Sequence, residues 1–220
     1  MKIVFSVGGS LVCPDELDLD FIKSFCSFVK QLSKQHRISI VVGGGRLARK
    51  YISASRSSSN EIKDLLGIEA THLNAMLVAA CLGARSVYLR RVSPGDLKSN
   101  SIVVTVGTTP GHSTDAVAAE IAVKMKADLI VNASNIKGVF SMDPSKNPNA
   151  KLLSNMTSKE LLEIVSNLPQ TPGKYALIDH LAVETISKNK IKTIILNGRN
   201  LSNIRKAIEG KEFTGTLVKG

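Results

Sequence analysis

Three short segments rich in glycine or hydroxyl groups each follow an apolar, β-branched run of the sequence. They are Gly8-Gly9-Ser10, Gly43-Gly44-Gly45 and the stretch from Gly107 to Asp115. Glycine lets backbone N–H groups come close to an anion, and Ser or Thr hydroxyls add further donors. In open parallel sheets, ligands bind beyond the carboxyl ends of the strands. These segments therefore favour the binding of phosphate groups.

The three segments differ in how well a purely structural role explains them. Gly8-Gly9-Ser10 also fits a plain tight turn, and the third segment also fits a loop that caps a helix. Three consecutive glycines cost backbone entropy on folding, so a tight turn alone explains Gly43–Gly45 poorly. This segment leads into a predicted helix that carries Arg49, whose guanidinium suits a phosphate. His112 alone is compatible with an ordinary loop histidine.

The elements that must position these segments alternate between strand and helix patterns. Short β-branched runs predict strands at Lys2–Val7, Arg37–Val42, Ser86–Leu89, Ile102–Val106, Asp128–Asn132, Thr193–Asn197 and Thr214–Val218. Apolar spacing predicts helices that begin after Asp18 or Asp20 and at Leu47–Ser55, Asn60–Leu82, Thr114–Lys126, Ser158–Val165, Ala176–Lys188 and Ser202–Ile208, with Gly67 as a candidate kink. The alternation predicts one α/β domain over residues 1–220, a mainly parallel central sheet covered by helices on both faces.

Composition excludes several classes of protein. The 220 residues are 43% apolar and 21% charged, which disfavours disorder. No apolar stretch reaches the roughly 18–20 residues that a membrane span needs, so no membrane partner is expected. The three cysteines are widely spaced and the four histidines are scattered, so we expect no protein-bound metal cluster and no disulfide framework. The cysteine usage fits a reducing cytoplasm.

The chain is strongly basic, with 29 Lys and Arg against 18 Asp and Glu and a net charge of +11. Such a charge suits nucleic acid or an anionic small substrate. The basic residues are dispersed, and the absence of Trp leaves few rings on which bases could stack. We therefore expect no nucleic-acid partner. Several separate phosphate segments on one sheet instead suggest two phosphorylated ligands that face each other.

Five motifs in register resemble the amino acid kinase superfamily and, within it, the archaeal UMP kinases. Besides Gly8–Ser10 they are GGGRLAR at residues 43–49, DLLGIEATHLNAML at residues 64–77, PGHSTDA at residues 110–116 and GVFSMDP at residues 138–144. The resemblance runs from about Lys2 to the C-terminus. It implies the three-layer α/β fold of that family and transfer of the ATP γ-phosphoryl group to UMP, giving UDP.

The resemblance also implies cofactors, partners and site residues. Magnesium accompanies ATP, no protein-held metal is expected, and the family suggests a homohexamer. An N-terminal lobe holds UMP through Gly44, Asp64, Thr108, Thr109, Pro110, Gly111, His112, Ser113 and Thr114. A C-terminal lobe holds ATP, and the ATP contacts are Ser6, Val7, Gly8, Gly9, Ser10, Gly45, Arg49, Ser134, Phe140 and Asp143. Arg49 stabilises phosphate charge and Asp115 orders nearby cations, so these two are the catalytic candidates.

The sequence departs from the family at a few positions. Ser6 stands where many members of the superfamily carry Lys, and Lys137 stands where they commonly carry Asp. His72 replaces an Arg that is typical of the archaeal enzymes. Asp179 resembles a further family acidic residue, and it is equally compatible with capping a helix.

Three alternatives remain open at this stage. One is another kinase of the same fold, such as isopentenyl phosphate kinase, which Asp64 disfavours because a carboxylate suits a ribose hydroxyl better than a prenyl tail. A second is a non-catalytic anion-binding protein, which Arg49 disfavours and the missing Lys at position 6 keeps open. The third is a basic nucleic-acid-binding module.

Overall fold

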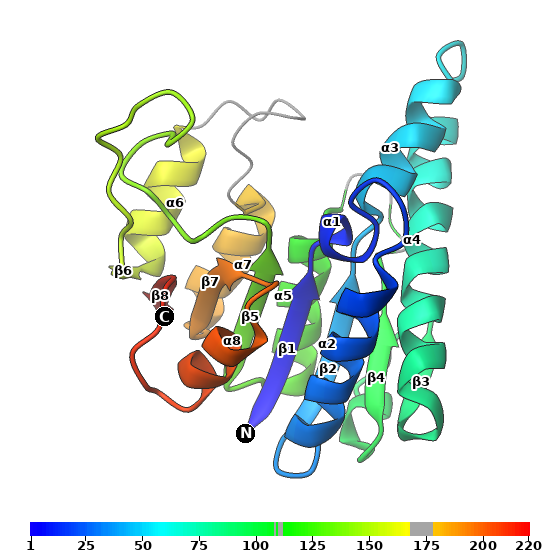
Figure 1. Cartoon of the computed structure of the whole chain (residues 1–220), viewed down its shortest axis with the longest axis horizontal. Helices are drawn as coiled ribbons and strands as arrows, with labels where there is room; N and C mark the ends of the chain where they lie inside the picture. The colour runs from blue at the N-terminus through cyan, green and yellow to red at the C-terminus, as the bar shows by residue number, and fades with distance from the viewer. Residues whose placement is uncertain (108, 110–111, 168–177) are drawn as a thin grey trace.

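The computed structural model describes residues 1–107, 109, 112–167 and 178–220. Its centre is an 8-stranded sheet with the order β3-β4-β2-β1-β5-β7-β8-β6 (Figure 1). The strands are β1 Lys2–Val7, β2 Arg37–Val42, β3 Ser86–Leu89, β4 Ile102–Thr105, β5 Leu129–Ser134, β6 Asn155–Thr157, β7 Thr193–Asn197 and β8 Thr216–Lys219. Every neighbouring pair is parallel except β7 and β8. The predicted α/β class with a mainly parallel sheet is confirmed.

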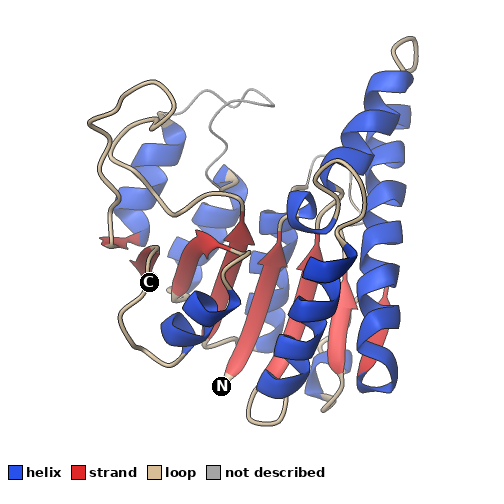
Figure 2. Ribbon diagram, viewed as in Figure 1, coloured by secondary structure: helices blue, strands red, loops and turns tan. Residues whose placement is uncertain are grey.

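Helices cover both faces of this sheet (Figure 2). They are α1 Gly9–Val12, α2 Leu19–Leu32, α3 Gly45–Ala54, α4 Asn60–Leu82, α5 Thr114–Met125, α6 Ser158–Ser166, α7 His180–Asn189 and α8 Leu201–Ile208, with short 3₁₀ turns η1 Gly83–Arg85 and η2 Asp96–Lys98. Apolar side chains of α2, α4 and α8 pack on one face, and those of α5, α6 and α7 pack on the other. α3 packs against α4.

Helix α2 illustrates how the sequence dictates an element. Its first turn is capped by Asp18, whose carboxylate accepts the Phe21 backbone N–H at 2.9 Å, which settles the choice between Asp18 and Asp20. One face of the helix is apolar, and Phe25 from that face meets Phe5 of β1 edge to face at 5.8 Å. Phe5 and Phe25 are fully buried, so this contact ties α2 to the central strand.

Some details of the fold differ from the sequence-based expectations. α4 continues through Gly67 without a break, and the missing side chain leaves room for the Ile52 side chain of α3. β6 was not predicted, because three residues are too few to show a periodicity. The predicted helix start at Ala176 lies outside the described residues, and the described part of α7 begins at His180.

The path of the chain places the three glycine- or hydroxyl-rich segments at one edge of the sheet. From β1 the chain moves to β2 and β4 on one side, then crosses to β5 and β7 on the other side of β1. Ligands of open α/β sheets bind at such a reversal, beyond the carboxyl ends of the strands. The segments that follow β1, β2 and β4 therefore come together there.

One segment in the described part of the chain, Asn60–Arg85, is long and apolar enough to cross a membrane by length and composition. The expectation that no stretch of the sequence reaches this length was therefore wrong. The core helices of globular proteins pass the same test, and α4 buries Ala75, Val78 and Leu82 against the sheet. The result is weak evidence for a membrane span.

Candidate active site

The first two glycine segments touch each other directly. Gly8 precedes α1, so the predicted tight turn is the start of a short helix. A Cβ atom on Gly9 would lie 2.1 Å from the Gly45 backbone nitrogen and 2.3 Å from the Gly43 carbonyl oxygen. Gly45 itself has a φ of +59°, which L side chains rarely adopt. Only glycine at these positions allows the two segments to approach so closely.

The third segment reaches the same point through the first residue of α5. A Cβ atom on Gly43 would lie 2.9 Å from the Thr114 hydroxyl oxygen. Ser113 caps α5, and its hydroxyl accepts the Ala116 backbone N–H at 3.1 Å. The predicted phosphate segments thus converge on one small region, whereas Thr108, Pro110 and Gly111 lie outside the described residues.

A buried polar cluster lies beside the glycine segments. The Ser6 hydroxyl donates to Asp115 Oδ1 at 2.7 Å, and the Asn132 amide donates to the same oxygen at 2.8 Å. Ser6 and Asn132 are almost completely buried. The structure therefore joins Ser6 and Asp115, which are 109 positions apart in the sequence. Asn132 was missed, because a single Asn in the apolar run of β5 gives no signal of its own.

The electrostatics of Asp115 follow from this burial. Desolvation is the largest effect and raises the pKa of the carboxyl above its usual range. The hydrogen bond from Ser6 opposes that rise, and the nearby Asp179 carboxylate adds to it. Asp179 also caps α7, accepting the backbone N–H groups of Leu181 and Ala182. Asp179 therefore caps a helix, as one interpretation of the sequence expected, and its carboxylate also lies near Asp115.

A cavity of about 410 Å³ opens next to the glycine segments, between α3, α4 and the start of α5. Five predicted substrate residues line it: Asp64, Thr109, His112, Ser113 and Thr114. The remaining lining residues are not among the predicted UMP contacts, although Gly107 begins the third predicted segment: Ala48, Ile52, Gly67, Ile68, Thr71 and Gly107. The helical spacing of Gly67, Ile68 and Thr71 from Asp64 could have found three of them, because such positions share one face of a helix.

The two arginines of α3 have different surroundings. Arg46 pairs with Asp15 at 2.5 Å. Arg49 lies one turn further along the helix, is exposed, and has no ion-pair partner among the described residues. Its guanidinium is therefore unpaired among the described residues.

His112 stands on the loop before α5 and pairs with Glu120 of that helix at 3.1 Å. The pair holds a side chain that lines both the 410 Å³ cavity and a neighbouring cavity, which Arg90, Arg91 and Lys124 also line. His112 therefore contributes to the shape of the wall, and nothing in its contacts resembles a nucleophile–base pair.

Three predicted ATP contacts lie at the end of β5 or after it: Ser134, Phe140 and Asp143. Ser134 ends that strand beside Gly8, where a Cβ atom on the glycine would lie 3.4 Å from the serine Cβ. Phe140 forms an isolated bridge with Leu152. Asp143 accepts the Ser145 hydroxyl at 2.7 Å and the Ser145 backbone N–H at 2.9 Å, and these bonds lower the pKa of its carboxyl. The structure thus brings Ser134 to the glycine segments and engages Asp143 in a local turn.

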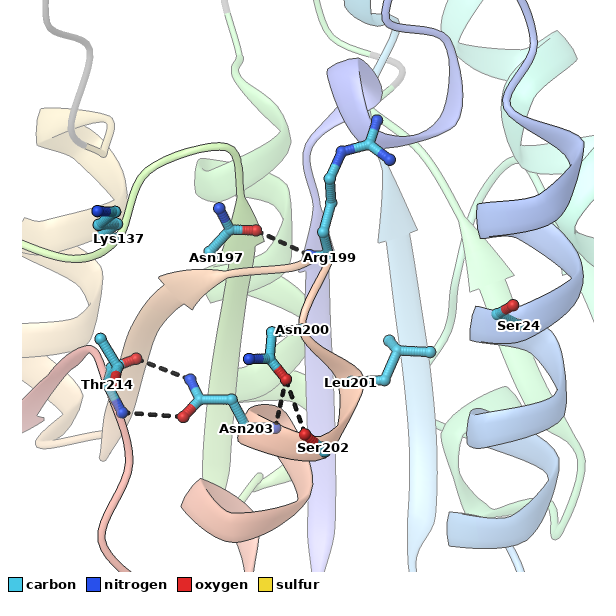
Figure 3. A pocket seen from close by; sticks show the side chains of 9 residues that line it. All are labelled: Ser24, Lys137, Asn197, Arg199, Asn200, Leu201, Ser202, Asn203 and Thr214. Atoms are coloured by element: carbon cyan, nitrogen blue, oxygen red, sulfur yellow. Dashed lines mark hydrogen bonds between the residues drawn. The ribbon is translucent and has the colours of Figure 1, made fainter.

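A larger cavity, of about 750 Å³, lies between α2, α8 and the end of β7. Figure 3 shows Lys137, Asn197 and Asn203 among its lining side chains. Arg199 extends from this cavity and pairs with Asp18 at 2.8 Å. None of the predicted site residues that the structure describes lines it.

Comparisons with known proteins agree with this geometry. Residues 1–197 match the model of the amino acid kinase family. The chain is 40% identical to the uridylate kinase of Thermococcus kodakarensis and 41% identical to that of Pyrococcus abyssi, and in both cases the match covers 100% of each chain. Among solved structures, the uridylate kinase of Archaeoglobus fulgidus superposes with a TM-score of 0.87 at 38% identity, covering 99% of this chain and 100% of that one. The UMP kinase of Bacillus anthracis, at 17% identity and a TM-score of 0.84, shares the fold.

Proposed function

The chain belongs to the amino acid kinase family, and from that premise we propose that it transfers the γ-phosphoryl group of ATP to UMP, giving UDP and ADP. The observation that carries the proposal is the 410 Å³ cavity, which has a carboxylate, Asp64, on its wall and the glycine segments beside it. A carboxylate accepts hydrogen bonds from ribose hydroxyls, and the glycine segments suit the phosphate. The relatives named uridylate kinase match along the whole chain.

Phosphoryl transfer requires the protein mainly to position two phosphates and to stabilise their charge. In our proposal UMP lies in the cavity, with its ribose at Asp64 and its phosphate at Gly44 and Thr114. ATP places its phosphates over Ser6 to Ser10 and Gly45, on the other side of the contact between the first two glycine segments. Arg49, which has no ion-pair partner among the described residues, stabilises the charge on the phosphoryl group that moves between them.

We propose that magnesium accompanies ATP. Among the described residues, no group of three or more His, Cys, Asp or Glu side chains gathers into a metal site. Magnesium is commonly bound through one or two carboxylates together with substrate phosphates, and the Asp115 carboxylate fits that donor set. When bound, the ion would neutralise phosphate charge. Ser6 and Asn132 both donate to Asp115 Oδ1 and thereby fix the orientation of its carboxylate.

In our proposal, the two parts of the chain bind different substrates. Residues 1–220 form one domain in which the N-terminal part, with α3 and α4, binds UMP and the C-terminal part, after β5, binds ATP. The cytoplasm is the proposed compartment, and all three cysteines are free thiols. The proposed place of the reaction is the synthesis of pyrimidine nucleotides.

We also propose a homo-oligomer, with a hexamer as the form that the family resemblance implies. Helix α4 presents large apolar side chains to solvent along one side: Ile62, Leu65, Leu73 and Met76 are each about half exposed. Exposed apolar stripes of this kind are typical of protein interfaces. Equilibrium sedimentation tests this proposal, and a monomer at micromolar concentration would contradict it.

The substrate is tested by an assay of the purified protein with ATP, magnesium and one of four acceptors: UMP, CMP, AMP or isopentenyl phosphate. We expect efficient turnover of UMP and much poorer turnover of CMP. Turnover of isopentenyl phosphate without turnover of UMP would assign the protein to the alternative kinase. Binding of phosphate compounds with no turnover of any acceptor would favour the non-catalytic alternative.

A further inference from the structure

Asn74 of α4 lies directly behind the Gly43–Gly45 segment and is almost completely buried, with 1% of its surface exposed. Its side-chain nitrogen donates two hydrogen bonds to that segment, at 3.0 Å to the Gly43 carbonyl and at 3.1 Å to the Gly44 carbonyl. One side chain therefore holds two successive peptide groups of the turn. Neither the UMP contacts nor the ATP contacts derived from the sequence include Asn74.

The direction of these two bonds decides where the neighbouring N–H groups point. In a trans peptide the C=O and the N–H lie on opposite sides of the chain, and the described residues contain no cis peptide bonds. Because the Gly43 carbonyl faces Asn74, the Gly44 N–H faces away from α4. The Gly44 carbonyl likewise accepts from Asn74, and it also accepts the Ala48 backbone N–H at 3.2 Å, so the Gly45 N–H points away from α4. Gly9 of α1 lies beside the Gly45 backbone nitrogen as well as the Gly43 carbonyl oxygen, and a Cβ atom on Gly43 would meet the Thr114 hydroxyl.

The other end of the Asn74 amide is unusual. Its Oδ1 atom is buried and has no hydrogen-bond partner among the described residues. A buried acceptor without a partner costs stability. The orientation of the amide is nevertheless fixed, since exchanging nitrogen for oxygen would set an acceptor against two carbonyl acceptors. The side chain thus leaves one end unpaired and keeps both glycine carbonyls in place.

Asn203 shows what a buried asparagine with a purely structural role does in the same molecule. Its nitrogen donates to the Thr214 carbonyl at 2.7 Å, and its oxygen accepts the Thr214 N–H at 2.9 Å. Both ends of this amide are satisfied, and it joins α8 to the segment before β8. Asn74 differs because both of its side-chain hydrogen bonds go to one turn.

We propose that Asn74 is the positioning residue of the phosphate site: it aims the Gly44 and Gly45 N–H groups at bound phosphate by holding the two carbonyls on the opposite side. It touches no substrate and acts only through the turn. The kinetic part of this inference rests on the proposed function, because it requires turnover of UMP. The binding part requires only an anion at the turn.

The test compares Asn74→Leu, which keeps the approximate size of the side chain and removes both donors, with Asn203→Leu as the matched control. Both variants lose two hydrogen bonds from a buried amide, so we expect both to lower Tm. We expect kcat/KM for UMP to fall about 10- to 100-fold in Asn74→Leu, through both KM and kcat. The control should stay within about twofold of the wild type.

A second readout separates positioning from stability. In ¹⁵N-resolved NMR spectra, titration of the wild type with pyrophosphate should shift the Gly44 and Gly45 amide resonances. In Asn74→Leu these two resonances should start at different positions and respond much less. If Asn74→Leu does not fold, Asn74→Ala removes the same donors with the better helix former and takes its place.

Wild-type kinetics in Asn74→Leu or unchanged Gly44 and Gly45 resonances would overturn the inference. So would a wild-type protein in which pyrophosphate leaves both resonances in place. If the wild type binds pyrophosphate at these amides and does not turn over UMP, the proposed function fails and the NMR comparison still decides the role of Asn74.

Discussion

The floor of the candidate site, formed by Ser6, Gly9, Gly43–Gly45, Asp115 and Asn132, is largely buried and tightly hydrogen-bonded. Its wall, formed by Asp64, Thr109 and His112, is exposed to solvent. Floor atoms are held at 2.7–2.8 Å by partners from distant parts of the sequence, whereas Asp64 has no hydrogen bond among the described residues that fixes its carboxylate. Phosphate transfer depends on fixed geometry, and recognition of a sugar needs only a reachable acceptor. We therefore expect changes in the floor to affect turnover and changes in the wall to affect KM.

The largest effect should follow from Gly9→Ala in the floor. The added methyl would lie 2.1–2.5 Å from backbone atoms of the Gly43–Gly45 segment, which cannot move aside as a side chain would. We expect loss of nearly all UMP kinase activity and a lower Tm. Gly95→Ala is the control, because its methyl would meet only the Ser93 hydroxyl at an ordinary 3.5 Å. Substantial activity in Gly9→Ala would show that the two glycine segments need not touch.

Arg49→Ala should have the next largest effect. Removal of one charge-stabilising donor from a phosphoryl-transfer site lowers kcat/KM by roughly 100-fold or more. Arg46→Ala is the matched control on the same helix, since it breaks only an exposed ion pair with Asp15, and such pairs are worth about 0–1 kcal/mol. A folded Arg49→Ala protein with the activity of the control would remove Arg49 from the mechanism.

Asp64→Asn tests the wall. A hydrogen bond to a charged partner contributes about 1.5–3 kcal/mol, so the UMP KM should rise roughly 10- to 150-fold. The ATP KM should stay nearly unchanged. Glu61→Gln, which alters an exposed carboxylate one turn earlier on α4, should leave both constants alone. An equal loss of affinity for ATP would mean that Asp64 belongs to the floor, and it would contradict the separation of floor and wall.

The smallest effect concerns the stability of the floor. Burial raises the pKa of Asp115 in the folded state, so its protonated form stabilises the fold below the unfolded-state pKa of about 3.9. That stabilisation is lost as the pH rises through the folded-state pKa. Asn is neutral at every pH, and its Oδ1 can accept the bonds from Ser6 and Asn132. At pH 7 we expect Asp115→Asn to raise Tm, because the substitution removes a charge whose burial is unfavourable, while kcat falls.

The Tm difference between Asp115→Asn and the wild type should shrink as the pH is lowered toward 4. The control is Asp128→Asn, which changes an exposed carboxylate that accepts the Lys2 backbone N–H at 2.7 Å. That variant should not raise Tm. A lower Tm for Asp115→Asn at pH 7 would mean that the buried charge stabilises the floor.

The contrast between floor and wall also explains what the sequence could predict. Apolar runs and their alternation with helical patterns predict most strands and helices, because burial on both faces of a parallel sheet demands β-branched residues in β1 and β2. The glycine segments stand out because three glycines in a row are costly without a close approach. In the floor, the contact between Ser6 and Asp115 follows only from the resemblance to a family and from the topology, since no local pattern joins residues so far apart.

The missed residues share a physical cause. Asn74 and Asn132 are single polar residues in apolar surroundings, and their importance lies in which atoms their amides meet across the fold. Thr71 lies on the Asp64 face of α4, so helical spacing could have identified it as a wall residue. The antiparallel pairing of β7 and β8 depends on how the chain returns after α8, which strand patterns do not encode.

The most direct test of the proposed binding mode is a comparison of UMP with its deoxyribose analogue on the wild type and on Asp64→Asn. If the ribose lies against Asp64, the wild type should prefer UMP, and the substitution should remove part of that preference while the analogue loses less. The two substrates and two proteins close a thermodynamic cycle, and its coupling term isolates the contact between the carboxylate and the sugar hydroxyl. We predict a clearly non-zero coupling term. Equal losses for both substrates, or an unchanged UMP KM, would contradict the placement of UMP in this cavity.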